Sequence, residues 1–353
     1  MSSWSSIAPV LAGGGRLSYR QSRRMMQEVM SGIVDDVQLA AFLSLLTLRG
    51  ADVAELRGLA DEMQEHAESI DLPHDVVDIV GTGGDGAQTV NISTMASVVI
   101  AAAGFPVVKH GNRASTSKSG SADVLEALGV NLELSAQELV QAFDECGIAF
   151  LFANKFHPSM RYAARVRRDL GFPTVFNILG PLTNPARPTA SVVGVAREKM
   201  APLVAGVFQQ RGTSAFVFRG TRYGLDELST VEPAVVWEAH DGNLVQSVID
   251  PARLLGLKQA DLSELKGGGP QENAQVARDV FEGAPGPIAQ SVALNAAMGI
   301  IAAQEQAGSG SPAPGPTGPL EDRLVAAYEV AWSTMEDGLA SAKLDAWVRA
   351  TSR

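Results

Sequence analysis

The sequence predicts an α/β protein in which a small, all-helical N-terminal domain precedes a larger α/β domain with a mostly parallel central sheet flanked by helices. Before residue 70, apolar residues recur at helical spacing and no strand pattern appears. After residue 75, short β-branched runs alternate with helical stretches, as in parallel strands joined by helices. We therefore expect a helical domain at 1–73, joined by helical residues near 168–190, and an α/β domain at 74–353.

Composition limits the classes of protein that the chain can represent. Its 353 residues are 46% hydrophobic and 19% charged, which fits a globular protein with a sizeable core. The net charge of −11 disfavours a nucleic-acid-binding surface. A single cysteine, Cys146, excludes an internal disulfide, and its place in an apolar helical pattern predicts a buried, inert thiol.

Nothing in the sequence predicts a membrane segment or a secretion signal. The longest apolar run, near 98–108, is interrupted by Gly104 and Pro106, and it is shorter than the roughly 20 residues that span a bilayer. The N-terminus lacks the charged-then-apolar layout of a signal peptide. We expect a cytoplasmic protein without a membrane partner.

The N-terminal domain is expected to be helical from about residue 18 to 70. A stripe of methionines marks a first helix that stops at Gly32, and Asp36 is expected to cap a second helix that ends before Gly50. Asp52 and Glu55 have the spacing of a capping box for a third helix. These apolar stripes predict a core or a subunit interface.

A glycine-rich loop follows the first predicted strand, Val76–Val80. Gly81, Gly83, Gly84 and Gly86 cannot continue that strand, and they allow positive φ angles and close backbone approach to a ligand. A short helix follows at 93–103. Loop amides together with a helix N-terminus favour a phosphate group.

A second strand and loop repeat this arrangement. Residues 106–108 form a short apolar strand that delivers Lys109 at its end. The following loop is rich in cations and hydroxyls that suit several phosphate oxygens, with Arg113 as a bidentate clamp. Its polar residues are Asn112, Arg113, Ser115, Thr116, Ser117, Lys118, Ser119 and Ser121. The alternative is a pair of tight turns without a ligand.

The rest of the chain continues the α/β pattern. Helices are predicted at 120–128, 135–147, 200–209, 276–281 and 288–304, and two more at 320–348. Strands are predicted at 148–152, 191–195 and 214–218, followed by a hairpin at 234–249 that turns at Asp241-Gly242. Residues 180–185 are expected to be irregular, and the Gly/Ser/Pro-rich stretch at 307–319 to be a surface loop.

Adjacent carboxylates at Asp226 and Glu227 follow the strand at 214–218. Such a pair is a hard-ligand set of the kind that Mg²⁺ accepts while it keeps waters and contacts substrate phosphates. The alternative from spacing alone is two solvated acids on a turn.

Four motifs resemble those of the anthranilate phosphoribosyltransferase family, and the likeness covers nearly the whole chain. They are Gly81-Thr82-Gly83-Gly84-Asp85, Asn91-Ile92-Ser93-Thr94, Lys109-His110-Gly111-Asn112-Arg113 and Ser119-Gly120-Ser121-Ala122-Asp123. The resemblance implies that the amine of anthranilate attacks C1 of phosphoribosyl pyrophosphate and releases pyrophosphate, a step of tryptophan biosynthesis. It also implies a homodimer formed through the helical domain.

The resemblance further implies a set of site residues. Two magnesium ions are expected, with Asp226 and Glu227 as ligands of one and Ser93 as an oxygen ligand of the other. The anthranilate contacts would be Gly81, His110, Asn112, His157, Arg167 and Pro181. The phosphoribosyl pyrophosphate contacts would be Gly81, Gly84, Asp85, Thr89, Asn91, Ser93, Thr94, Lys109, Asn112, Arg113, Ala114, Ser115, Thr116, Ser117 and Ser121.

No residue is expected to act as a nucleophile or as an essential base. The aromatic amine is neutral at pH 7 and can attack without a base, so we expect positioning and electrostatics to carry the reaction, and a proton-transfer role for His110 or His157 is not required. Two other functions remain open: a pyrimidine nucleoside phosphorylase-like enzyme of similar fold, and a non-catalytic relative that binds nucleic acid. A different acceptor for the phosphoribosyl group is a third.

Overall fold

The computed structural model describes residues 3–73, 75–114, 118–306 and 318–352. The chain forms two compact units: Met1–Ser69 with Ala153–Arg187, and Ile70–Phe152 with Pro188–Arg353. The first unit is helical and the second contains a seven-stranded sheet, which confirms the predicted fold class. The second segment of the helical unit begins at Ala153.

The first helix of this unit begins earlier in the chain than the sequence predicted. Helix α1 (Trp4–Ala12) precedes the expected start near residue 18, and the buried Glu28 carboxylate accepts hydrogen bonds from the Ser3 amide. Helix α3 is capped by Asp35, whose side chain accepts from the Gln38 amide, and not by Asp36. The other helices are α2 (Tyr19–Met30), α3 (Asp36–Arg49), α4 (Val53–Glu65), α8 (Ala153–Phe156), α9 (Arg161–Leu170) and α10 (Phe176–Leu179).

Two details of this unit test the local sequence signals. The predicted capping box of α4 is present, because Asp52 accepts from the Glu55 amide and Glu55 accepts from the Asp52 amide. The stretch expected to be irregular contains a short 3₁₀ turn, Gly180–Leu182, and a second such turn lies at Pro158–Met160.

The sheet of the second unit has the order β3-β2-β1-β4-β5-β6-β7. The first five strands in this order are parallel to one another, whereas β6 pairs antiparallel with β5 and β7 pairs antiparallel with β6. The strands are β1 (Val77–Gly81), β2 (Val107–Gly111), β3 (Ile148–Phe152), β4 (Ala190–Gly194), β5 (Ser214–Gly220), β6 (Ala234–His240) and β7 (Asn243–Ile249). The predicted hairpin turns at Asp241 and Gly242, both with positive φ, as expected for its turn type.

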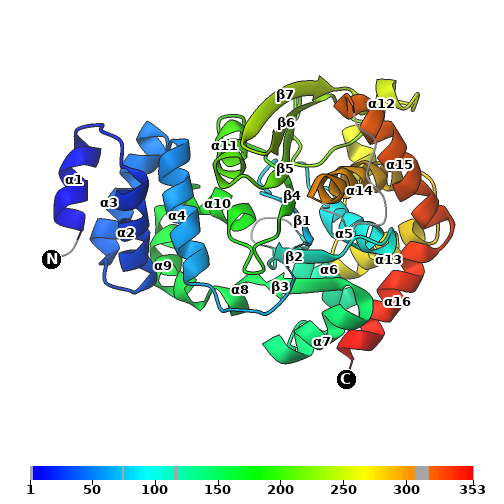
Figure 1. Ribbon diagram of the computed structural model, residues 1–353, viewed down its shortest axis with the longest axis horizontal. Helices are drawn as coiled ribbons and strands as arrows, with labels where there is room; N and C mark the ends of the chain where they lie inside the picture. The colour runs from blue at the N-terminus through cyan, green and yellow to red at the C-terminus, as the bar shows by residue number, and fades with distance from the viewer. Residues whose placement is uncertain (1–2, 74, 115–117, 307–317, 353) are drawn as a thin grey trace. The chain divides into compact units, whose positions relative to one another are not determined.

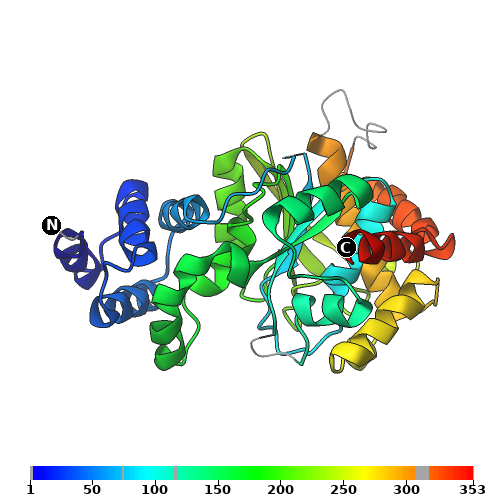
Figure 2. The ribbon, with the colours of Figure 1, turned by 90° about the horizontal axis from the view of Figure 1, so that it is seen from below.

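Helices cover both faces of this sheet (Figure 1). Helices α5 (Ile92–Ala102) and α14 (Pro287–Gln306) pack on one face against β1, and α11 (Ala201–Arg211) packs on the other against β5 and β6. Figure 2 shows the C-terminal helix α16 (Leu339–Thr351) beside α5 and α7 (Ala136–Cys146). The remaining helices are α6 (Ser121–Leu128), α12 (Pro251–Leu254), α13 (Pro270–Phe281) and α15 (Leu320–Glu336), with a 3₁₀ turn at Leu262–Leu265.

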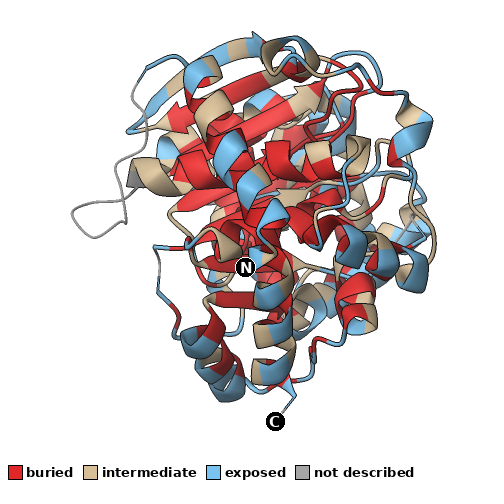
Figure 3. Cartoon of the chain, turned by 90° about the vertical axis from the view of Figure 1, so that its right-hand side faces the viewer, coloured by how far each residue is buried: buried red, intermediate tan, exposed pale blue. Residues whose placement is uncertain are grey.

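Burial follows the layers of this unit (Figure 3). Strand β4 is buried along its whole length, whereas β7 carries exposed residues at the edge of the sheet. Cys146 is buried at the end of α7, which confirms the predicted burial of this thiol. Across the described residues, we find no helix with both the length and the apolar character needed to cross a bilayer.

Candidate active site

The order in which the chain adds strands to the sheet reverses at β1. Strands β2 and β3 lie on one side of β1, and β4 and β5 lie on the other, so the loops after β1 and β4 diverge at the carboxyl edge of the sheet. Ligands of open α/β sheets bind at such a switch point. The Thr82 amide donates to the Gly194 carbonyl at 2.9 Å, which joins the ends of these two strands.

The glycine loop at this edge has the backbone geometry that its sequence predicted. Gly83, Gly84 and Gly86 have φ angles of 66°, 86° and 75°, in the left-handed region. Asp85 stabilises the turn, because its Oδ1 accepts from the Ala87 amide at 3.0 Å. Gly81 serves a different purpose: a Cβ there would lie 2.6 Å from Oδ2 of Asp226.

The carboxylates of Asp226 and Glu227 are buried at the same place, with exposed fractions of 6% and 9%. This excludes the alternative of two solvated acids on a turn. Asp226 Oδ2 accepts from the Gly83 amide at 2.5 Å, and Glu227 Oε1 accepts from the Ser93 amide at 3.1 Å. The acid pair therefore contacts both the glycine loop and the N-terminus of α5.

Burial raises the pKa of both acids. The pKa of Asp226 rises to about 7, chiefly because burial penalises its charge and secondly because Asp85 repels it. The pKa of Glu227 is also raised, by burial and by the charge of Asp226, against the lowering effect of Lys109. A cation placed beside them would relieve this penalty.

Lys109 lies inside β2, and not at its end as predicted. Residues 109–111 pair with β3, so the strand runs past Val108, and the Lys109 side chain is 1% exposed. Its Nζ donates to the Ile79 carbonyl and, at 3.3 Å, to Ser93 Oγ. Burial lowers the pKa of this amine, while the charges of Asp78 and Glu227 raise it. Lys109 therefore contacts an expected metal ligand from within the sheet.

The residues present fit a magnesium ion that is completed by substrate. The nearby donors are carboxylate and hydroxyl oxygens, the hard ligands that Mg²⁺ prefers. Within the described residues, no three acidic, histidine or cysteine side chains converge as a preformed metal cage. In the same described part of the chain, the buried hydroxyl of Thr94 has no hydrogen-bond partner. Two carboxylates beside hydroxyl groups suit an ion that also binds phosphate oxygens.

Arg113, the predicted phosphate clamp, is bound to acidic side chains in this structure. Its guanidinium donates to Glu126 through both terminal nitrogens, at 2.5 and 2.8 Å, and to Asp123 at 3.0 Å. These hydrogen bonds raise the pKa of Arg113. Asp123 also accepts from the Ala114 and Gly120 amides at 3.0 and 2.8 Å, which draws the two ends of the loop together.

Other predicted residues of this loop are only partly placed. Asn112 is exposed and its Oδ1 accepts from the Arg113 amide at 2.8 Å. Lys118 is exposed and Ser121 begins α6. His110 is buried, and its amide donates to Asp78 at 3.1 Å. The predicted contacts Ser115, Thr116 and Ser117 lie outside the described residues.

The side chain of Asn91 binds other protein groups at both ends. Its Oδ1 accepts from Asn273 Nδ2 at 2.9 Å, and its Nδ2 donates to the Ser119 carbonyl at 3.1 Å. Thr89 pairs with Lys266 in an isolated bridge on the same side of the loop. Sequence reasoning placed Asn91 and Thr89 at the ligand but did not identify Asn273, although the Gly267-Gly268-Gly269 run before α13 was an available signal.

A second residue that sequence reasoning missed is Glu232, which is 3% exposed. Its carboxylate accepts from the backbone amides of Arg222, Tyr223 and Leu225, immediately before the acid pair. Backbone amides that converge on one carboxylate in this way form an anion-binding site. An acid just before a predicted strand gave no signal of this role.

The predicted residues of the helical unit differ in their surroundings. The Arg165 and Arg168 side chains are 73% and 77% exposed and pair with Asp169. Arg167 is half-buried over the Phe176 ring at 5.2 Å, burial lowers its pKa, and no acidic residue in the described part of the chain pairs with it. A half-buried cation without a carboxylate is suited to an anionic ligand.

His157 and Pro181 are also buried in this unit. The His157 ring Nε2 lies 3.0 Å from the Thr183 carbonyl, which selects the tautomer that carries a proton on Nε2. Burial lowers the pKa of His157 to about 4, although the hydrogen bond to Thr183 opposes this shift. A histidine that stays neutral in this way does not supply a proton at pH 7.

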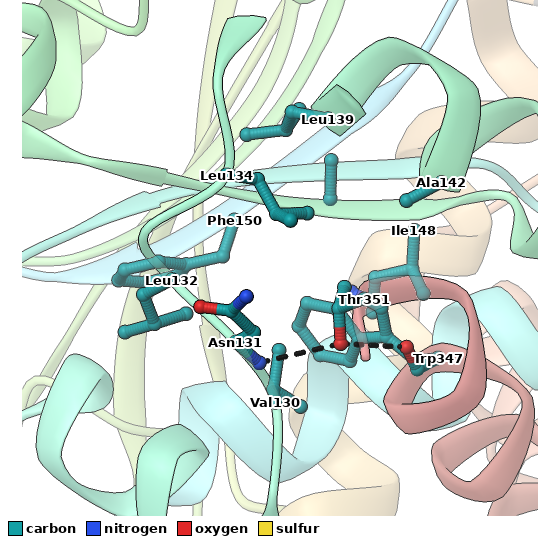
Figure 4. A pocket seen from close by; sticks show the side chains of 11 residues that line it. Val130, Asn131, Leu132, Leu134, Leu139, Ala142, Ile148, Phe150, Trp347 and Thr351 are labelled. Carbon is teal, nitrogen blue, oxygen red and sulfur yellow. Dashed lines mark hydrogen bonds between the residues drawn. The ribbon is translucent and has the colours of Figure 1, made fainter. Parts of the chain in front are cut away.

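A pocket elsewhere in the second unit includes none of the predicted site residues (Figure 4). It lies against α7, β3 and α16, and its walls are mostly apolar. The Asn131 amide donates to Thr351 Oγ1, which donates to the Trp347 carbonyl, and these bonds close one side.

Comparison with known proteins identifies related families and structures. The family described as glycosyl transferase family, a/b domain, matches residues 73–338, and its helical bundle domain matches residues 7–67. An anthranilate phosphoribosyltransferase of Thermobifida fusca (strain YX) is 48% identical over 99% of this chain and 97% of its own length.

Solved structures agree with these matches. The crystal structure of anthranilate phosphoribosyltransferase (TrpD) from Thermus thermophilus has a TM-score of 0.87 and 38% identity, and covers 100% of both chains. The Saccharomyces cerevisiae enzyme in complex with PRPP and Mg has a TM-score of 0.81 and 27% identity over 95% of this chain and 94% of that one. Its complex with 4-fluoroanthranilate has a TM-score of 0.79 and 25% identity over the same shares.

Proposed function

Because the chain belongs to the anthranilate phosphoribosyltransferase family, we propose that it transfers the phosphoribosyl group of phosphoribosyl pyrophosphate to the amine of anthranilate in tryptophan biosynthesis. The observation that carries this proposal is the buried acid pair. Asp226 accepts from the glycine loop and Glu227 accepts from the first turn of α5, so one acid pair contacts both segments suited to pyrophosphate.

In the proposed reaction, the bond between C1 and the pyrophosphate oxygen breaks and a bond from the anthranilate nitrogen to C1 forms. The bonding electron pair leaves with pyrophosphate, and the nitrogen loses one proton to water. Holding the two reactants in line can supply about 7–11 kcal/mol of the barrier. The amides of the glycine loop and of α5 would stabilise the charge that grows on the leaving group.

We propose that Asp226, Glu227 and Ser93 hold magnesium, with two ions as the expected number. Bound there, magnesium would neutralise phosphate charge and so improve the leaving group. The buried oxygens and the raised pKa values of both acids support this assignment. Replacing Asp226→Asn and Glu227→Gln together should abolish magnesium-dependent pyrophosphate binding in calorimetry. Wild-type binding in that double variant would refute the metal site.

We further propose that the phosphoribosyl pyrophosphate contacts are those predicted from the sequence, and that the loop after β2 meets the 5-phosphate. Arg113 would then exchange Glu126 for a phosphate oxygen, which its exposure allows, because both side chains of this ion pair are more than one third exposed. Lys109 would act on Ser93 from within β2 and not as a free loop cation.

For anthranilate, we propose that Arg167 pairs with the carboxylate and that Gly81, His110, Asn112, His157 and Pro181 are further contacts. The absence of an acidic partner for Arg167 among the described residues supports its role. Arg167→Ala should raise the KM for anthranilate far more than the KM for the sugar donor. Arg168→Ala, an exposed neighbour paired with Asp169, is the matched control. Equal rises in both KM values would remove this assignment.

We also propose a homodimer formed through the helical unit. Helix α3 exposes Val37 at 78% and Leu48 at 87%, and Ile33 just before it is 64% exposed. Large apolar residues exposed on and beside one helix are suited to a protein interface. Leu48→Glu should convert a dimer into monomers in analytical ultracentrifugation. A wild-type protein that sediments as a monomer would exclude the dimer.

A further inference from the structure

Asn273 is a buried amide that joins three segments of the second unit. It lies in the first turns of α13 and is 3% exposed. Its Oδ1 accepts from the Gly268 amide at 2.7 Å, and its Nδ2 donates to Asn91 Oδ1 at 2.9 Å. Since Asn91 then donates to the Ser119 carbonyl, the two side chains form a continuous chain of hydrogen bonds.

The backbone on either side of this chain is packed too closely for free movement. The Val90 amide donates to the Leu265 carbonyl, and the Gly267 amide donates to the Gln88 carbonyl, each at 2.9 Å. A Cβ at Gly267 would lie 2.8 Å from the Val90 Cα and 2.9 Å from Asn273 Oδ1. The end of the glycine loop is thus fixed to the segment that precedes α13.

Asn91 does not cap α5 with its side chain, although it stands at the N-cap position. Its amide group is used instead to reach Ser119, two residues before α6 begins. We propose above that pyrophosphate binds at the glycine loop and the N-terminus of α5, and that the 5-phosphate binds the loop after β2, to which Ser119 belongs. The asparagine pair therefore lies between the supports of two separate phosphate sites.

We propose that Asn273 is a positioning residue that acts through Asn91 to set the separation between the pyrophosphate and 5-phosphate sites. This inference rests on the proposed function, because it requires a ligand that carries both groups. A ligand that spans two sites gains affinity only when their spacing is already correct, since any ordering of the sites reduces the binding free energy. A ligand that occupies one site does not depend on the spacing.

The test compares a ligand that spans both sites with one that fills a single site. Asn273→Ala removes both hydrogen bonds. Asn273→Asp keeps the oxygen that accepts from the Gly268 amide, but it places a second oxygen opposite Asn91 Oδ1. This variant therefore loses only the hydrogen bond to Asn91. Gln275→Ala on the same helix is the matched control, because Gln275 is exposed and its side-chain amide donates to Asp279, one turn further along α13. Calorimetry with magnesium measures the Kd of phosphoribosyl pyrophosphate and of pyrophosphate alone.

We expect the Kd of phosphoribosyl pyrophosphate to rise about tenfold in both Asn273 variants and the Kd of pyrophosphate to change less than about threefold, given the cost of unmade hydrogen bonds. Circular dichroism establishes that each variant folds, and Asn273→Asp decides the matter if Asn273→Ala does not fold. Equal losses for both ligands, or no loss for either, would overturn the inference while the proposed function stands. A wild-type protein that ignores phosphoribosyl pyrophosphate would overturn both.

Discussion

Gly194 at the end of β4 offers a direct test of how the acid pair is positioned. A Cβ at this residue would lie 1.6 Å from the Asp226 carbonyl oxygen and 2.4 Å from its carbonyl carbon. Real Cβ atoms essentially never approach closer than 3.0 Å, so in Gly194→Ala the Asp226 carbonyl must move by at least about 1.4 Å, the difference between 3.0 and 1.6 Å. No rotamer can relieve this contact, because the clashing atoms of Asp226 belong to the backbone.

Such a shift should affect the site more than the fold. Overpacking of this kind costs about 1–3 kcal/mol of unfolding free energy. A displacement of about 1 Å at reacting groups can reduce catalysis about 100-fold. The Asp226 carboxylate would lose its 2.5 Å contact with the Gly83 amide, and Glu227 would move away from the Ser93 amide. We therefore expect kcat/KM to fall by about two orders of magnitude while the protein stays folded.

The assay is steady-state turnover at several magnesium concentrations, together with urea unfolding of the same protein. Gly269→Ala is the matched control, since a Cβ there meets only Glu272, at 3.9 Å, and its φ of −71° is accessible to alanine. The control should keep wild-type turnover and stability within about 0.5 kcal/mol. Wild-type turnover in Gly194→Ala would refute the view that close backbone packing positions Asp226.

Three further outcomes are expected. Since the pKa of Asp226 is raised from its usual 3.8 to about 7, its contribution to the free energy of unfolding is fully present below pH 3.8 and is lost as pH rises through 7. Magnesium binds the ionised carboxylate, so the magnesium-induced rise in Tm should grow between about pH 6 and 8. A rise in Tm that does not depend on pH would contradict this. The pKa of His157 is lowered from 6.5 to about 4, so the free energy of unfolding should fall by about 3 kcal/mol as pH drops from 6.5 to 4. In urea titrations, His157→Gln should remove this dependence on pH. Glu232→Ala should cost about 1–3 kcal/mol in unfolding free energy because three amides lose their acceptor, whereas the exposed Glu282→Ala should cost almost nothing.

Local signals in the sequence predicted the elements well. The capping box of α4 needs only residues 52 and 55, and the hairpin turn needs only Asp241 and Gly242. The positive φ angles of the glycine loop follow from residue type in the same way. These features depend on neighbours a few positions apart, so one sequence is sufficient to predict them.

The contacts that build the site join residues that are far apart in the chain. Gly83 and Asp226 are separated by 143 positions, and Asn91 and Asn273 by 182. Hydrophobic periodicity places the strands but gives no register between them, so it could not show that Lys109 would be buried within β2. Arg167 illustrates the same limit, because only its burial and lack of an acidic partner among the described residues distinguish it from Arg165 and Arg168.

The charged groups of the proposed site are each bound to other protein groups within the second unit. Glu227 accepts from the Ser93 amide, Lys109 donates to Ser93 Oγ, and Arg113 is bound by Glu126. A phosphate oxygen that binds the Ser93 amide must therefore displace the Glu227 carboxylate, and it would then lie beside two buried acids. Once these acids are ionised, their Coulomb repulsion of phosphate is several times stronger than in water. Pyrophosphate should consequently bind poorly unless a divalent cation accompanies it, which makes the cation a requirement for binding as well as for the chemical step.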